Sequence, residues 1–212
     1  MTPPRGRTGR PPLTEERKAE IRLEIARAAV DLFAAQGVAA TTGEQIARAA
    51  GISARTLWRY FPTKESCVRP LFSAGIEAIA ARLRAWPSGR PLREAFEDGL
   101  PADDRLTGGP DRTTVGELLR LTRTEPGLRA VWLQSYDEAE PAFARALAER
   151  AALPPGDLRP AIQAAMLNAA LRASVEYHAW HTGPAAPGSA AVDADLTATV
   201  RAALTIATEG VV

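Results

Sequence analysis

Apolar residues recur along the chain at intervals of three and four, the spacing of one face of an α-helix, almost from end to end. Alanine is abundant, and no run of β-branched residues indicates a strand. The first helix is expected to begin after Thr14, an N-cap followed by two glutamates, and to end at an αL cap on Gly37. Its apolar face is expected to contain Ile21, Ile25, Ala28, Leu32 and Phe33. The pattern therefore predicts an all-α protein.

Two short helices are predicted to follow. Thr42 opens the first of them, and Gln45, three residues later, completes a capping box. After Gly51, which closes that helix, Ser53 caps another helix that Pro62 limits to about two turns, because proline disfavours helical geometry in the residue before it. Leu57 and Phe61 of this helix and Ile46, Ala47 and Ala50 of the one before it are expected to point inward.

Longer helices with proline- and glycine-rich breaks are predicted for the remainder. A fourth helix is expected at about 63–86, with an apolar side made of Val68, Leu71, Phe72, Ile76, Ile79 and Leu83. A break at 87–91 precedes a short helix to about Gly99, and residues 101–112 form the clearest interior loop. Further helical stretches are expected at 113–151 with a bend at Pro126, at 157–181 and at 193–208, the last two separated by residues 182–191.

The length and composition limit the class of protein. A chain of 212 residues can form one large or two small domains and bury a core without disulfides, and its single cysteine, Cys67, has no internal partner. The amino terminus lacks the apolar run of a secretory signal, and no segment reaches the roughly 18 apolar residues of a membrane helix. The chain is therefore expected to be soluble and cytoplasmic, with no membrane partner.

Charge is distributed unevenly. Residues 1–70 contain 12 Lys and Arg against 7 Asp and Glu, whereas residues 71–212 contain 14 against 18. This asymmetry is expected when one end of a protein meets phosphate. Residues 1–13, with the arginine-rich stretch "RGRTGRPP", are expected to form a disordered basic tail, which either reads the DNA minor groove or adds only nonspecific attraction.

Two short helices joined by a glycine-containing turn are typical of the helix-turn-helix motif. If Leu57 and Phe61 anchor the second helix, its other face presents Arg55, Thr56, Trp58, Arg59 and Tyr60. Such a helix fits a B-DNA major groove about 12 Å wide, in which arginine pairs with guanine and threonine contacts the thymine methyl group. The alternative is a solvated face of a plain helical bundle, with Trp58 packed on a neighbouring helix.

The stretch "LFAAQGVAATTGEQIARAAGISARTLWRYFPTKES" resembles the TetR family of bacterial repressors in the order of its residues. The resemblance implies a three-helix DNA-binding head at 14–62 on a helical body at 63–212 that binds a ligand and forms a homodimer. It assigns a phosphate contact to Thr42, base reading to Arg55, Thr56 and Arg59, and backbone contacts to Trp58, Tyr60 and Lys64. Trp58 replaces the usual tyrosine, and Gly43 replaces a larger apolar residue, which should loosen the first turn of its helix.

A regulator also needs a signal that switches its DNA binding, and we expect the body to contain the binding site for that signal, a small-molecule effector. A mainly apolar cavity with a few polar groups is predicted there, although each residue taken singly is more often part of a plain core. The candidate effector-binding residues are Phe96, Leu118, Leu121, Trp132, Tyr136, Met166, Leu167, Asn168, Leu171, Val175 and His178. The stretches 118–150 and 158–180 also resemble regulators associated with mycofactocin loci, which implies an acyl-CoA-like effector.

The predicted helix at 157–181 has two apolar or small faces and therefore two packing partners. One face contains Ile162, Met166, Ala169, Ala173 and Tyr177, and the other contains Leu167, Leu171 and Ser174. One partner is expected to be the helix's own subunit and the other a second subunit, with Leu196, Val200, Ala203 and Ala207 of the last helix completing a four-helix dimer interface. A dimer predicts an inverted-repeat operator in double-stranded DNA.

Two other classes of function compete with this interpretation. For an enzyme, His178 and His181 could hold a metal, but no carboxylate or cysteine cluster completes the site, and no phosphate loop or nucleophile elbow is present. Neither a catalytic residue nor a cofactor is therefore expected. A helical protein-interaction module explains the body but leaves the basic first third unexplained. The sequence favours a ligand-responsive DNA-binding transcriptional regulator, a repressor by resemblance.

Overall fold

The structure is a computed structural model that describes residues 14–96, 110–154, 156–181 and 190–209. Every regular element in these ranges is helical, so the all-α prediction is confirmed. The elements are α1 (Glu15–Gln36), α2 (Gly43–Ala49), α3 (Ala54–Tyr60), the 3₁₀ helix η1 (Glu65–Val68), α4 (Arg69–Ala85), the 3₁₀ helix η2 (Leu92–Phe96), α6 (Pro110–Leu121), α7 (Pro126–Arg150), α8 (Arg159–His181) and α9 (Ala190–Glu209). The predicted tail at 1–13 and most of the predicted breaks at 101–112 and 182–191 lie outside the described residues.

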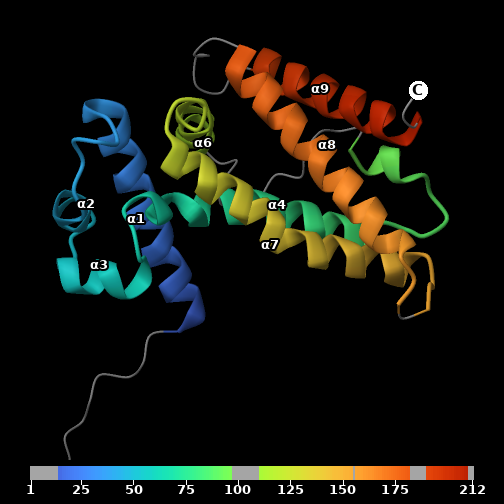
Figure 1. The fold of residues 1–212 in the computed structure, drawn as a ribbon, viewed down its shortest axis with the longest axis horizontal. Coiled ribbons are helices and arrows are strands. Elements are labelled where there is room, and N and C mark those ends of the chain that lie inside the picture. Colours follow the sequence, from blue (N-terminus) through green and yellow to red (C-terminus); the bar gives the residue numbers. More distant parts are fainter. Residues whose placement is uncertain (1–13, 97–109, 155, 182–189, 210–212) are drawn as a thin grey trace, which may run out of the picture.

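The helices form two groups that share α4 (Figure 1). Helices α1, α2 and α3 pack on one another at the left of the view, and α1 also contacts α4, α6 and η1. In the second group α7 packs against both α4 and α8, and α8 packs along α9. We call residues 14–62 the head and residues 63–212 the body. None of the helices in the described ranges combines the length and apolar character that a bilayer crossing requires.

Local hydrogen bonds explain where the head helices begin. The Thr14 hydroxyl accepts a hydrogen bond from the Arg17 amide at 3.2 Å, and the Ser53 hydroxyl accepts one from the Thr56 amide at 3.1 Å. The predicted capping box is present, because Thr42 accepts from the Gln45 amide at 3.3 Å while the Gln45 side chain accepts from the Thr42 amide at 2.8 Å. All three predicted N-caps are therefore confirmed.

The predicted C-cap of α1 is wrong in its geometry. Gly37 has a φ of 84°, which favours glycine, but its ψ of 156° lies outside the left-handed helical region. Its amide still donates to the carbonyl of Phe33 at 2.9 Å. The chain therefore leaves α1 in an extended direction at Gly37, whereas Gly51, with a φ of 66°, gives the sharp turn between α2 and α3.

Prolines begin helices at three places where the sequence pattern suggested otherwise. The predicted helix at 63–86 is divided into η1 and α4, and Pro70 is in the first turn of α4. Pro126 begins α7 rather than bending one long helix, and Pro110 begins α6 inside the predicted loop. A proline suits a first helical turn because the amide that it lacks would have no intrahelical acceptor there. A different proline, Pro141, lies inside α7.

One continuous apolar core runs from the head into the body. All six residues predicted for the apolar side of the fourth helix are buried in it. Phe72 of α4 packs on Trp132 of α7 with ring centroids 4.8 Å apart, and Trp132 packs on Tyr136 at 4.6 Å. Cys67 is also buried, and burial raises the pKa of its thiol to about 12, so this cysteine is a filler of the core rather than a nucleophile.

Candidate nucleic-acid interface and effector region

Helix α3 separates an anchoring face from an exposed face. Leu57 is buried between the head helices, whereas Arg55 and Arg59 are exposed. No hydrogen bond or ion pair links Arg55 to another described residue, so its guanidinium is available to a ligand. Thr56 shares a hydrogen bond of 2.8 Å with the Ser53 hydroxyl. The helix therefore presents two unburied cations from one side of a rigid, packed element.

The other predicted contact residues differ in how free their polar groups are. Thr42 is exposed, and its hydroxyl serves as the N-cap of α2. Tyr60 is partly buried between two guanidiniums, with Arg22 of α1 at 5.5 Å and Arg59 at 5.3 Å from its ring centroid. Trp58 is 42% exposed and lies over Gly43. Because the capping box is complete and Gly43 is covered, the first turn of α2 is not loosened, contrary to expectation.

Lys64 has a structural role that the sequence did not indicate. Its ammonium group donates to the carbonyl of Val38 at 2.6 Å and to that of Thr41 at 2.9 Å. These bonds tie the segment before α2 to the start of η1 and satisfy two carbonyls of a loop. One of the three ammonium hydrogens remains for another acceptor. Any phosphate contact by Lys64 would therefore be secondary to this internal clamp.

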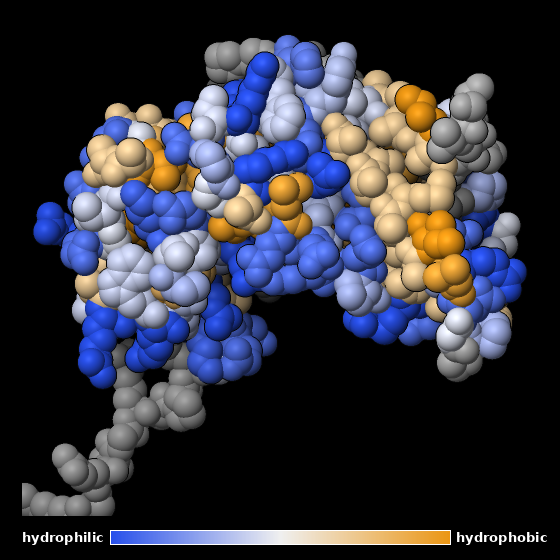
Figure 2. All heavy atoms as spheres, viewed as in Figure 1, coloured by the Kyte–Doolittle hydropathy of each residue, from blue (hydrophilic) through white to orange (hydrophobic). Residues whose placement is uncertain are grey.

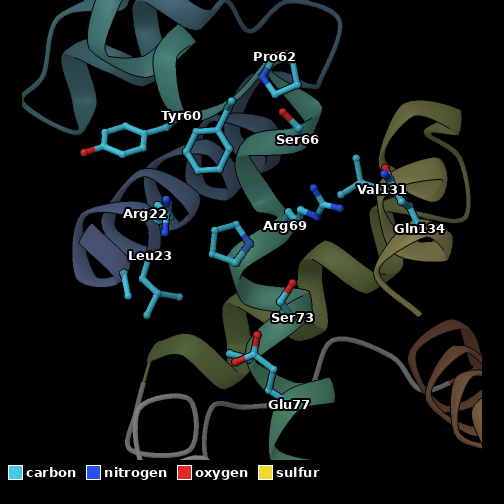
Figure 3. Close-up of a pocket in the computed structure, with 14 residues that line it drawn as sticks. Arg22, Leu23, Tyr60, Pro62, Ser66, Arg69, Ser73, Glu77, Val131 and Gln134 are labelled. Carbon is cyan, nitrogen blue, oxygen red and sulfur yellow. The ribbon is translucent and has the colours of Figure 1, made fainter. Parts of the chain in front are cut away.

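The head and the body meet along a cleft of about 460 Å³. Figure 3 shows Arg22 and Leu23 of α1 on one side, Val131 and Gln134 of α7 on the other, and residues of α4 between them. Across the cleft Arg69 pairs with Glu138 of α7. The remaining lining residues are Ala19, Tyr60, Phe61, Pro62, Ser66, Pro70, Ser73, Ala74 and Glu77.

A second contact, between η1 and α7, lies at the start of α7. A Cβ placed on Gly127 would be 2.9 Å from Cγ of Glu65, so the absence of a side chain there lets Glu65 approach the first turn of α7. An acidic group is favourable at this end of a helix because of the helix dipole. The amino end of α7 is thus held against η1, while the next turns of α7 carry Trp132 and Tyr136.

Most of the candidate effector-binding residues converge on the interior of the body. Phe96, Leu118, Trp132, Tyr136, Leu167, Asn168, Leu171, Val175 and His178 are buried, and Leu121 is partly buried. Asn168 of α8 donates to the carbonyl of Tyr136 at 3.1 Å and to the carboxylate of Glu140 at 3.2 Å. Met166 does not belong to this group, because it is 45% exposed on the opposite side of α8.

Glu176, a buried carboxylate of the body with three hydrogen-bonding partners, was missed by sequence reasoning. Its carboxylate is buried and accepts hydrogen bonds from Arg129 at 2.5 Å, from Trp132 at 2.7 Å and from Arg172 at 3.2 Å. Burial raises the pKa of Glu176, but the hydrogen bonds from Arg129 and Trp132 and the two positive charges outweigh it and hold the pKa below its ordinary value. For the adjacent Tyr136, burial, assisted by the charge of Glu176, raises the hydroxyl pKa.

The E176Q variant is expected to lower the free energy of unfolding by about 2 kcal/mol at pH 7, within the range for hydrogen bonds to a charged group. Because the pKa of Glu176 is lower in the folded than in the unfolded chain, its contribution is present above the unfolded-state pKa and is lost as the pH falls through the folded-state value. The difference between wild type and variant should therefore shrink below pH of about 4.5. Urea unfolding of both proteins at pH 7 and pH 4 measures this difference in the free energy of unfolding.

The matched control is E149Q, at an exposed glutamate of α7, which should change stability at neither pH. An E176Q effect of the same size at both pH values would show that Glu176 acts through packing rather than through its charge.

Helix α8 has the two faces predicted for it, but α9 does not present the expected residues. Leu167, Leu171 and Ser174 are buried, whereas Ile162, Met166, Ala169, Ala173 and Tyr177 are exposed. On α9, Val200 is buried against its own subunit, and Leu196, Ala203 and Ala207 are partly buried. The exposed side of α9 instead contains Ala198, Ala202 and Ile206. Figure 2 shows apolar atoms gathered at the right of the view, over α8 and α9.

Comparison with known proteins agrees with this architecture. The family described as "Bacterial regulatory proteins, tetR family" matches residues 25–71, and the family described as "MftR C-terminal domain" matches residues 110–209. A protein of Mycobacterium tuberculosis named as a mycofactocin biosynthesis transcriptional regulator, MftR, is 30% identical over 157 residues, which cover 74% of this chain and 77% of that protein. The chain belongs to the TetR family. Its members are transcriptional regulators and not enzymes, as the sequence predicted.

Two further similarities support the assignment. The HTH-type transcriptional regulator TcmR of Streptomyces glaucescens is 34% identical over 145 residues, covering 66% of this chain. The match spans 64% of the length of TcmR. The structure of Thermus thermophilus FadR in complex with lauroyl-CoA superposes with a TM-score of 0.50 at 22% identity, covering 90% of this chain and 95% of FadR, which shows a shared fold. Proteins of the TetR family are DNA-binding transcriptional regulators.

Proposed function

We propose that this TetR-family chain is a homodimeric repressor that binds an inverted-repeat operator and responds to an acyl-CoA-like effector. In this proposal residues 14–62 bind DNA, and residues 63–212 bind the effector and form the dimer. The observation that carries it is the division of α3, in which Leu57 is buried while Arg55 and Arg59 stand exposed on the other side. A buried anchor opposite unburied arginines is what base reading in a major groove requires.

The proposed interface with the DNA contains the residues that the sequence suggested, ordered by what the structure leaves free, and includes Trp58, which lies over Gly43. Arg55 and Arg59 are the proposed base readers, with Thr56 beside them. Thr42 and Tyr60 are the proposed phosphate contacts on either side of α3. Lys64 contributes mainly by holding the segment before α2 in place through two carbonyls.

The exposed side of α8 supports the dimer. Ile162, Met166 and Tyr177 are large side chains that the described part of the protomer leaves exposed, with the Tyr177 ring stacked on His181 at 4.3 Å, and Ala169 and Ala173 between them allow close approach of another helix. Exposed apolar patches of this kind mark interaction surfaces, and a two-fold axis lets the same patch cover itself. We therefore propose that α8 and the exposed side of α9 meet their copies in a four-helix interface.

Selection of bound duplexes from a random DNA library by the purified protein tests the DNA-binding part. An enriched inverted repeat is expected, with an affinity that falls steeply between low and moderate salt because phosphate contacts release counterions. The proposal would be contradicted if the folded dimer enriched no duplex. It would also be contradicted if the affinity for DNA barely changed with salt concentration.

Support for the effector class comes from the carboxyl-terminal family and from the chemistry of the body. The match to the MftR C-terminal domain covers the region in which Trp132, Tyr136 and Asn168 converge. Asn168 also has a buried side-chain oxygen with no hydrogen-bond donor among the described residues, an acceptor that an effector hydroxyl or amide could satisfy. FadR, which shares the fold, was crystallised with lauroyl-CoA.

The proposed switch requires an effector that binds one arrangement of the heads more tightly than another. Helices α4 and α7 run from the effector region to the head, and α7 touches η1 where Glu65 lies against Gly127. A shift of these helices would change the spacing of the two α3 helices on DNA.

Lauroyl-CoA at saturating concentration is expected to weaken binding of the selected duplex and to change tryptophan fluorescence, with the fluorescence change reduced in W132F. Free coenzyme A is the control. If lauroyl-CoA leaves both the affinity and the fluorescence unchanged, this effector class is wrong.

A further inference from the structure

Gly43 and Trp58 lie against each other across the helix-turn-helix. Gly43 is the first residue of α2 and is buried, while Trp58 is on α3 and half-exposed. A Cβ placed on Gly43 would lie 2.0 Å from Cζ2 and 2.3 Å from Cη2 of the indole, well inside any real contact distance. The six-membered ring of Trp58 therefore fills the space in which any other residue at position 43 would place its side chain.

This contact joins the start of α2 to the last turn of α3, the two helix ends that are far from the turn. The turn itself holds the end of α2 to the start of α3, and the amide of Ile52 donates to the carbonyl of Ala47 at 2.9 Å. Gly43 is at the opposite end of α2, and Trp58 is in the last turn of α3. The buried Leu57 and the turn already hold α3 against α2, and the contact between Gly43 and Trp58 adds an attachment at the far end that further limits rotation of α3.

The angle between α2 and α3 matters for base reading. Arg55 and Arg59 are on the same short helix as Trp58, so any rotation of α3 moves both guanidiniums. A bidentate arginine–guanine pair needs two N–H groups aligned with the base edge, and productive geometry has to be held within about 0.5 Å. Trp58 is thus well placed to control base reading without touching a base.

We infer that Trp58 is a positioning residue for base reading that acts by interlocking with Gly43, an inference that rests on the proposed DNA-binding role of α3. The interlock also accounts for the two positions at which the head departs from the TetR pattern. The wide indole occupies the site of the missing side chain, so one departure accommodates the other.

The G43A variant tests the interlock, because its added methyl group must displace the indole. Its affinity for the operator duplex selected by the wild-type protein is expected to fall at least about tenfold, while its affinity for a scrambled duplex changes less than about twofold, since lost positioning relaxes specificity. Adding W58Y to G43A should recover most of the operator affinity, because the narrower phenol ring leaves room for the methyl group. G75A, an alanine substitution in α4 with no atom within 4 Å of the new methyl group, is the matched control.

A readout that does not need DNA follows the tryptophan itself. With 5-fluorotryptophan in the four tryptophan positions, the ¹⁹F resonance that disappears in W58Y belongs to Trp58. In G43A this resonance is expected to shift while the other three stay in place. If G43A is poorly folded, recovery of folding and of operator affinity on adding W58Y supports the interlock, and its absence overturns it.

Two further results would overturn the inference. Equal weakening of G43A on operator and scrambled duplexes would make Trp58 a phosphate contact, and an equal effect of G43A with and without W58Y would make the two residues independent. Failure of the wild-type protein to enrich any duplex would instead refute the proposed function, with the ¹⁹F shift still reporting whether the contact exists.

Discussion

The R55A variant is expected to bind the selected operator duplex about 5- to 150-fold more weakly for each half-site contact that it loses, since a bidentate arginine–guanine pair contributes about 1–3 kcal/mol. A homodimer on an inverted repeat loses the contact twice, so the two costs add in the free energy of binding. Arg55 is exposed and has no partner among the described residues, so the free energy of unfolding should change by less than about 0.5 kcal/mol. Fluorescence anisotropy with labelled duplexes at a fixed salt concentration measures the affinity.

The outcome distinguishes three roles of Arg55. Relaxed preference at one base pair of each half-site identifies a base reader, whereas equal weakening on operator and scrambled duplexes identifies a phosphate contact. An unchanged affinity would leave Arg55 on a solvated face. R145A, at an exposed arginine of α7 in the body, is the matched control and should bind both duplexes like the wild type.

The A173E variant is expected to convert the dimer into a monomer and to abolish operator binding at concentrations at which the wild type is saturated. Ala173 is in the middle of the exposed face of α8, between Ala169 and Tyr177. In the proposed interface its carboxylate would be buried without a partner, a change that costs about 3–5 kcal/mol for each unpaired charge. The dissociation constant of the dimer should therefore rise more than about a hundredfold.

Sedimentation velocity at several protein concentrations measures this change, with circular dichroism as the check on folding. Helicity should be retained, because position 173 is exposed in the protomer and glutamate is a good helix former. A81E, which places the same charge on an exposed position of α4, is the control and should remain a dimer. A dimer that persists in A173E would move the interface away from this face of α8.

The head was predictable because its signals are local. The capping and turn residues act on backbone groups three or four residues away, so their effects are predictable from the neighbouring sequence. These residues are Thr42 with Gln45, Ser53, and the glycine at the turn. The exposed position of Arg55 follows as soon as Leu57 is assigned to the core, because the helical period fixes the opposite face. The capping geometry and the exposed arginines of α3 both follow the sequence.

Long-range partners were not predictable. Lys64 looked like a surface cation, yet it binds carbonyls 23 and 26 residues away in a loop that needs donors. Glu176 interrupts an apolar stretch and gave no sign of being buried, because the arginine and the tryptophan that satisfy it come from α7, 47 and 44 residues away. Nothing near these residues in sequence specifies such pairings.

The amino-acid sequence by itself determined the all-α class, the helix-turn-helix and the faces of its helices, since capping, turn and periodicity act within a few residues. The tertiary structure decided which of several apolar faces is covered within the protomer: on α8 it left Met166 exposed, and on α9 it buried Val200 and left Ile206 exposed. It also decided that Trp58 rests on Gly43. Burial depends on which elements meet in space. The sequence of a helix with two apolar sides therefore does not determine which side packs within its own subunit.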